Sequence, residues 1–117
     1  MPPERAAAVR AVVHREADYR DAMRALGGFP WDSEYSVEFD NAPVIGVLTA
    51  VAEGRITTHD AVAWAEYLEM RDDVTFRDRT ALDVLFEIAN PDLSGELTPE
   101  SARGLIARLA SEPPSIS

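Results

Sequence analysis

The sequence predicts an all-α protein, a compact bundle of about five helices with one extended or irregular segment near residues 31–40. Apolar residues recur at steps of three and four through most of the chain, which is the period of an amphipathic helix. Glycine, proline and threonine stand between these stretches, where helices end and begin. A chain of 117 residues, 46% of them apolar, suits one core. Residues 1–112 are therefore predicted as a single domain, and residues 113–117, which lack a period, as a flexible tail.

The first predicted helix spans residues 2 or 3 to about 26. Its apolar stripe consists of Val9, Val12, Tyr19, Met23 and Leu26. Glu16 takes the remaining stripe position, and we expect its side chain to reach solvent while neighbouring apolar residues continue the buried face. Gly27 and Gly28 end the helix, because glycine accepts the positive φ that a helix C-terminus often needs.

A glycine turn separates the second and third predicted helices. Asp40 or Asn41 caps the second, which is apolar on nearly every side and should be the most buried helix. Its expected core residues are Ile45, Leu48 and Val51. Gly54 ends it, and residues 57–60 have the form of a capping box that opens the third helix. That helix is expected to continue to about Arg71, where two aspartates break it.

The fourth predicted helix begins at Thr75 or Asp78 and ends at residues 90–91, because proline cannot continue it. Its expected buried stripe is Leu82, Leu85, Phe86 and Ile88. The fifth opens at Thr98, with proline and glutamate in its first turn. Its expected buried stripe is Ala102, Leu105, Ile106 and Leu109.

Two helix junctions share the pattern G-x-[I/L]-T-x-x-x-A, at residues 54–61 and 95–102. The pair resembles EF-hands, in which glycine fills the sixth loop position. The second loop, NPDLSGELTPES, also carries Asn90, Asp92 and Ser94 at its first, third and fifth positions. Its twelfth position is Ser101, where a bidentate glutamate should complete a calcium shell. We therefore expect no metal site and no cofactor.

Catalytic signatures are missing from the sequence. It contains no cysteine and no H-E-x-x-H, G-x-S-x-G, phosphate-loop or dinucleotide-binding pattern. His14 and His59 are expected to be partly exposed surface residues. The N-terminal stretch carries charges every few residues, so neither a signal peptide nor a membrane span is predicted. We expect a non-catalytic protein in the cytoplasm.

The formal charge of the chain is −10, and it is concentrated in the middle. Residues 29–100 hold sixteen acidic residues against four arginines, a net charge of −12 (4 − 16). This distribution argues against binding to nucleic acid, which depends on Lys and Arg. Two interpretations remain open: the acidity keeps the protein soluble, or its field speeds the encounter with a basic protein partner.

The stretch PWDSEYSVEFDN, residues 30–41, sets four carboxylates among three aromatic rings. From Tyr35 onward apolar and polar residues alternate, which favours an extended segment with Tyr35, Val37 and Phe39 docked on the helices. The alternative is a helical stripe of Trp31, Tyr35 and Phe39, although helix formers are few here. In either case the acids face water, and the predicted partner-binding residues are Trp31, Asp32, Glu34, Glu38 and Asp40.

A second acidic surface is predicted where the third helix ends. Carboxylates stand there beside Tyr67 and Met70. Aromatic and methionine side chains contribute buried area at interfaces, and acids attract a basic partner. The alternative is an ordinary solvated charged face. The predicted partner-binding residues are Glu66, Tyr67, Glu69, Asp72 and Asp73.

Residues 31–109 resemble a group of small, acidic, uncharacterised bacterial α-helical proteins. The similarity is carried by a W-D-x-E start, a G-x-I-[ST]-x-x-D junction, a W-A-x-x-L-E-x-R-D-D segment and an I-A-N-P-x-L-x-G-x-L-T-P-E ending. As a class they are similar to the immunity proteins that neutralise bacterial toxins, and this resemblance implies an inhibitor that covers a basic toxin surface. The alternatives are a degenerate EF-hand-like regulatory domain and a small enzyme with an unidentified carboxylate site.

Overall fold

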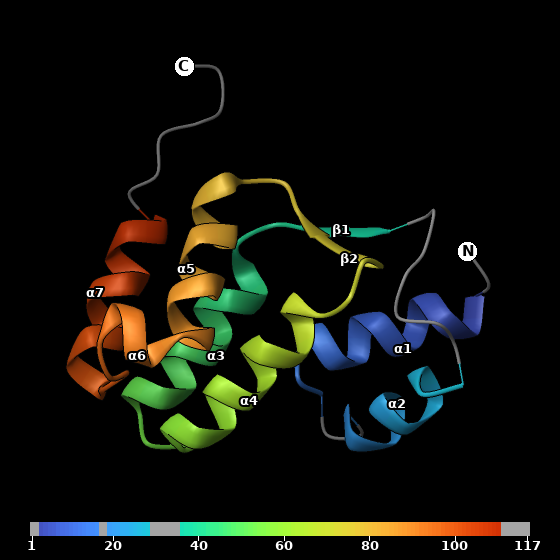
Figure 1. Cartoon of the computed structure of the whole chain (residues 1–117), viewed down its shortest axis with the longest axis horizontal. Helices are drawn as coiled ribbons and strands as arrows, with labels where there is room; N and C mark the ends of the chain where they lie inside the picture. Colours follow the sequence, from blue (N-terminus) through green and yellow to red (C-terminus); the bar gives the residue numbers. More distant parts are fainter. Residues whose placement is uncertain (1–2, 17–18, 29–35, 111–117) are drawn as a thin grey trace.

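The computed structural model describes residues 3–16, 19–28 and 36–110, and they form a mostly helical fold (Figure 1). The elements are α1 (Pro3–Val13), α2 (Tyr19–Leu26), β1 (Val37–Phe39), α3 (Ala42–Ala52), α4 (Thr58–Glu69), β2 (Val74–Phe76), α5 (Arg79–Ala89), α6 (Pro91–Ser94) and α7 (Pro99–Ala110). The helical class is confirmed, with a two-stranded sheet in addition. Within the described ranges no helix has the length and apolar character needed to cross a membrane. The predicted tail, residues 113–117, lies outside these ranges.

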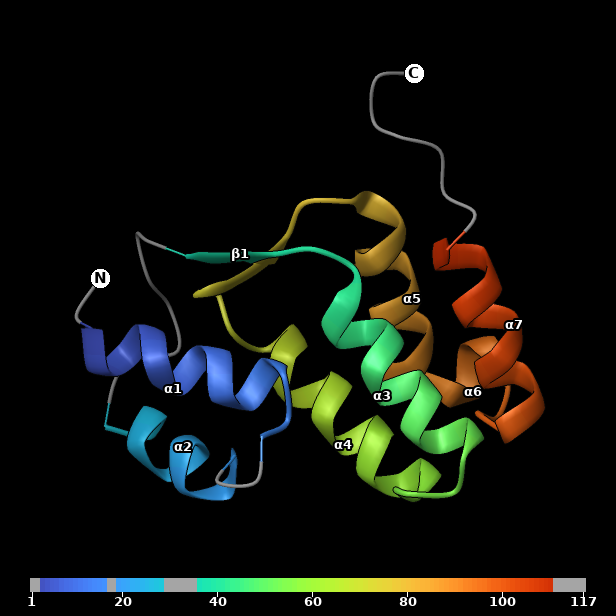
Figure 2. The same ribbon diagram turned by 180° about the vertical axis from the view of Figure 1, so that it is seen from behind.

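The prediction of one long N-terminal helix is wrong, because α1 and α2 are separate helices that lie side by side (Figures 1 and 2). Arg15 adopts a left-handed conformation with φ of 53°. Its N–H donates to the carbonyl of Val12 at 3.1 Å, and the N–H of Glu16 donates to the carbonyl of Ala11 at 2.9 Å. This pair of bonds is the Schellman ending of a helix, in which glycine usually occupies the left-handed position. An arginine there leaves no sequence signal for the break.

Residues 37–110 contain an internal structural repeat of strand, helix, junction and helix. The strands β1 and β2 pair in parallel, with Val37 opposite Val74 and Phe39 opposite Phe76. Both the strand and the helix that follows it recur after 37 residues (74 − 37 and 79 − 42). The junction glycines, Gly54 and Gly95, are 41 residues apart, and the four residues of α6 account for the difference. In space α3 packs on α7 and α4 on α5 (Figure 2).

The two helix junctions form as predicted, with glycine turns followed by capped helices. Gly54 and Gly95 have φ of 73° and 96°, which only glycine adopts readily. Thr57 accepts the N–H of Asp60 at 3.0 Å and so caps α4. Ser101, which takes the place of the EF-hand glutamate, accepts the N–H of Thr98 at 2.8 Å in the cap of α7. Its hydroxyl therefore has a structural role in this junction.

The core confirms the central position of α3 but corrects several expected contacts. Leu48 and Val51 are buried as predicted, whereas Ile45 is only partly buried. Leu82 and Phe86 were expected in the core, yet they are 43% and 46% exposed. Ile45 and Leu82 occupy equivalent positions of the repeat (82 − 45 = 37), at the edge of each helix's buried face. On α7, Leu105 and Ile106 are partly buried against the core.

Candidate functional site

A groove runs between α2 and α4, and it consists of two hollows that share Met23 and Tyr67. The first, which we call the basic hollow, has a volume of about 300 Å³ and is lined by Arg15, Tyr19, Arg20, Asp60 and Trp64 among others. The second, the acidic hollow, has a volume of about 450 Å³ and is lined by Leu26, Glu69, Met70, Arg71 and Asp72 in addition to the shared pair. Both volumes lie in the range of binding sites for small molecules and single side chains.

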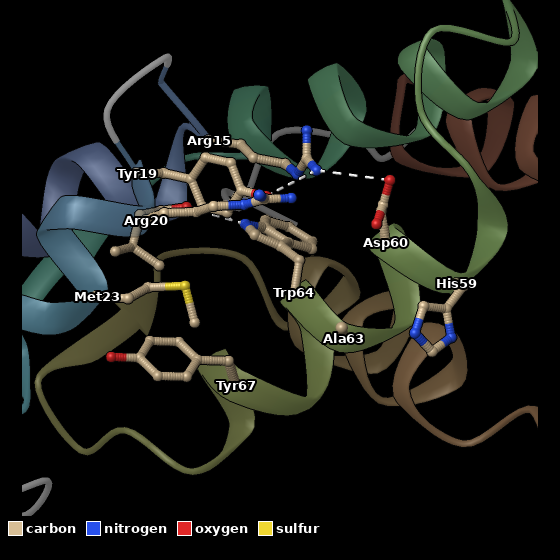
Figure 3. A pocket seen from close by; sticks show the side chains of 10 residues that line it. Arg15, Tyr19, Arg20, Met23, His59, Asp60, Ala63, Trp64 and Tyr67 are labelled. Atoms are coloured by element: carbon tan, nitrogen blue, oxygen red, sulfur yellow. Dashed lines mark hydrogen bonds and ion pairs between the residues drawn. The ribbon is translucent and has the colours of Figure 1, made fainter.

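Two guanidinium groups converge on one hydroxyl in the basic hollow. The hydroxyl of Tyr19 accepts from Nη2 of Arg15 at 3.1 Å and from Nε of Arg20 at 3.2 Å (Figure 3). The guanidinium of Arg15 lies 4.6 Å from the centre of the Tyr19 ring, and its Nη2 lies 3.9 Å from a carboxylate oxygen of Asp60. Nε of Arg15 is buried and has no hydrogen-bond partner among the described residues. The hollow is thus richer in positive than in negative charge.

The opposite wall of the basic hollow is apolar and fixed. The Trp64 ring is buried, and its indole N–H donates to the carbonyl of Val12 at 3.0 Å. Met23 and Tyr67 lie next to each other farther along the wall (Figure 3). Burial raises the pKa of Tyr67 above its usual value, so its hydroxyl stays protonated. The wall offers a rigid surface for a flat apolar group.

Asp60 stands at the rim of the basic hollow and is held by the cap of α4. A side-chain hydrogen bond with Thr57 lowers the pKa of Asp60 below its usual value, so the carboxylate is ionised at neutral pH. His59 lies beside it and is exposed. His14 is also exposed as predicted, and its ring packs edge-on against Phe39 at 5.7 Å between centroids.

The acidic hollow contains three of the predicted partner-binding residues. Tyr67 is half-buried, and Glu69 and Asp72 are exposed. Met70 extends from the same wall and is 63% exposed. Arg71 also lines the hollow, with its guanidinium 5.9 Å from the centre of the Tyr67 ring, and its hydrogen bonds to Asp73 offset part of its charge. Glu66, another predicted residue, is exposed on α4 but does not line the hollow.

The prediction that Asp73 contacts a partner is wrong, because its side chain is 0% exposed. One carboxylate oxygen accepts from Nη2 of Arg71 at 2.8 Å and from Nε of Arg5 at 3.0 Å, and the other from Nε of Arg71 at 3.1 Å. Burial alone would raise the pKa of Asp73, but the hydrogen bonds from Arg71 and Arg5 outweigh it and the pKa lies below its usual value. Asp73 therefore joins α1 to the end of α4.

The first predicted cluster is only partly described. Trp31, Asp32 and Glu34 lie outside the described residues. Residues 37–39 are extended, as predicted, and Phe39 is buried. Glu38 is exposed but faces Arg77 across the sheet at 3.3 Å. Asp40 accepts the N–H of Ala42 at 2.9 Å, so this carboxylate starts α3 in addition to facing solvent.

None of the sequence patterns predicts the basic hollow. Tyr19 was assigned to a continuous buried stripe, and nothing marked Arg15 as the turn that brings α2 against α4. A pair of arginines flanking one tyrosine is the only local signal, and it is weak. Among the described residues no group of three or more His, Asp or Glu side chains gathers to hold a metal ion.

Comparisons with protein-family models, with curated proteins and with solved structures were made for the whole chain. Because none of these comparisons finds a match, none of them tests the resemblance to toxin-immunity proteins, which stays a prediction. No family model, curated protein or solved structure matches this chain.

Proposed function

We propose that this protein is a non-catalytic binding module that engages a basic protein partner through the acidic hollow. The observation that carries the proposal is the joining of exposed apolar and acidic groups in one hollow of about 450 Å³. Single surface charges are common and say little, but an apolar floor beside an excess of acidic groups, here Glu69 and Asp72 against Arg71, suits a partner's basic side chain.

The hollow suits an arginine or lysine side chain. The apolar stem of such a residue can lie on Met23, Leu26 and Tyr67, while its charged head approaches Glu69 and Asp72. Glu69 accepts only a long hydrogen bond of 3.5 Å from Asn90, and no ion pair is formed by either carboxylate within the described ranges. Both are therefore available to a cation from outside.

The more specific form of the proposal is that the partner is a basic bacterial toxin and that this chain inhibits it in the cytoplasm. The net charge of −12 over residues 29–100 supports this form, because it accelerates association with a basic protein. The class resemblance of residues 31–109 to immunity proteins supports it as well.

A charge placed at Met70 tests the proposed surface. The partner is first captured from the source organism, and its Kd is then measured for Met70→Arg by titration calorimetry. We expect at least tenfold weaker binding with little change in stability, because an arginine at this exposed position repels a basic partner.

Leu93→Arg is the matched control, because Leu93 is an exposed apolar residue on α6 that does not line the hollow, with 76% of its surface accessible. It should bind like the parent protein. If both variants weaken binding equally, only net charge matters and the hollow is not the site. If neither does, the partner uses another face.

A further inference from the structure

The basic hollow carries a second proposal, which does not depend on the first. We propose that it binds a small aromatic carboxylate, with the carboxylate on Arg15 and Arg20 and the ring against Trp64. The hollow lies between the α1–α2 turn and α4, with an arginine pair on one side and an apolar wall on the other (Figure 3).

The arginine pair is the first argument. Two guanidinium groups donate to the same Tyr19 hydroxyl, at 3.1 and 3.2 Å, and so two positive charges share one neutral acceptor. The counter-ion that the described residues place in the hollow is Asp60, at 3.9 Å from Arg15. Like charges brought together repel each other unless an anion lies between them. A carboxylate accepts from guanidinium groups in the planar geometry that they favour.

The conformation of Arg15 is the second argument. A left-handed backbone costs an arginine free energy that glycine would not lose, and the turn itself needs no side chain. The Arg15 side chain is nevertheless largely enclosed, with 17% of its surface exposed, and its Nε has no acceptor within the described part of the chain. A buried donor without a partner is costly, and a carboxylate bound to the accessible part of the same guanidinium would offset that cost by its charge.

The size and lining of the hollow indicate the rest of the ligand. Trp64 is locked by its bond to Val12, and Met23 and Tyr67 extend the apolar wall. A volume of about 300 Å³ accommodates one aromatic ring with a short acidic arm. Aromatic rings and methionine make favourable contacts with such a ring.

The charged residues that line the basic hollow favour a ligand with one negative charge over a ligand with several. Two arginines and Asp60 leave a net charge of +1 in the hollow (2 − 1), which matches a monoanion. Asp60 would repel a doubly charged phosphate more strongly than a monoanion. Glu16 is exposed on the same turn but does not line the hollow.

Phenylacetate is a suitable probe, with phenylacetamide as its uncharged analogue. Both are titrated into the ¹⁵N-labelled full chain carrying Trp31→Phe, so that the one indole resonance belongs to Trp64. We expect saturable shifts of this resonance with phenylacetate, with a Kd on the order of 1 mM or below. Phenylacetamide should bind at least tenfold more weakly.

Two variants test the arginines. Arg15→Gly removes the guanidinium but supplies the residue that the left-handed turn favours, so the protein should fold at least as well and bind phenylacetate at least tenfold more weakly. Arg20→Gln changes an exposed residue and should also weaken binding, independently of the turn. Arg24→Gln, at another exposed arginine of α2, is the control and should leave the Kd unchanged.

Each other outcome overturns the proposal. Equal binding of phenylacetate and phenylacetamide would show an apolar pocket without anion recognition. Tighter binding of inorganic phosphate would assign the hollow to another class of anion. A tetrapeptide that ends in a free phenylalanine carboxylate and binds where phenylacetate does not would identify a protein chain end as the source of the carboxylate.

Discussion

Asp72 and Asp73 are neighbours in the sequence, yet they belong to two regions with opposite roles. Asp72 lies on the wall of the acidic hollow and is exposed. Asp73 is buried between Arg5 and Arg71 and holds α1 against the rest of the fold. The comparison shows that the density of acidic residues along a sequence does not tell which of them a partner can reach. The predictions below test this division of roles.

The largest expected effect is that of Asp73→Ala. Its removal takes away the carboxylate to which two buried arginines donate, which should lower the free energy of unfolding by about 3–5 kcal/mol. Asp72→Ala should change it by less than about 0.5 kcal/mol, as is usual for exposed positions. Urea unfolding followed by circular dichroism measures both. Equal stabilities of the two variants would contradict the division of roles.

The dependence of stability on pH should also differ between variants of Asp73 and variants of Asp72. The hydrogen bonds of Asp73 lower its pKa in the folded state, so its contribution is complete above the unfolded pKa of about 3.9 and is lost as pH falls through the folded value. Stability should therefore decrease with falling pH below about 4, and Asp73→Asn should show a shallower decrease. Asp72→Asn should follow the parent curve. If the stability of Asp73→Asn fell with pH as steeply as that of the parent protein, Asp73 would not cause the loss of stability in acid.

Local signals in the sequence were sufficient to predict much of the fold. Gly54, Thr57 and Thr98 mark helix ends and caps by chemistry that acts within a few residues, and the structure places the elements accordingly. The strand β2 was missed because three residues, Val74 to Phe76, give too short an alternation to recognise. Their pairing with β1 depends on a repeat that only the structure shows in full.

The candidate site was less predictable, because long-range contacts decide it. Arg5, which buries Asp73, is 68 residues away in the chain. The basic hollow depends on the left-handed turn at Arg15, which has no sequence signal. By contrast, Tyr67, Glu69 and Asp72 lie within six residues of one another at and just after the end of α4, so their grouping depends on local structure.

The association rate of the Glu69→Gln, Asp72→Asn double variant tests the central claim most directly. It is measured with the captured partner by stopped flow at low and at high salt, beside a control, Asp83→Asn with Glu96→Gln, that removes two exposed carboxylates outside the hollow. At low salt the hollow variant should associate about threefold more slowly than the control or slower still, and the difference should fade as salt screens the charges. Equal rates for the two variants at low salt would contradict the account.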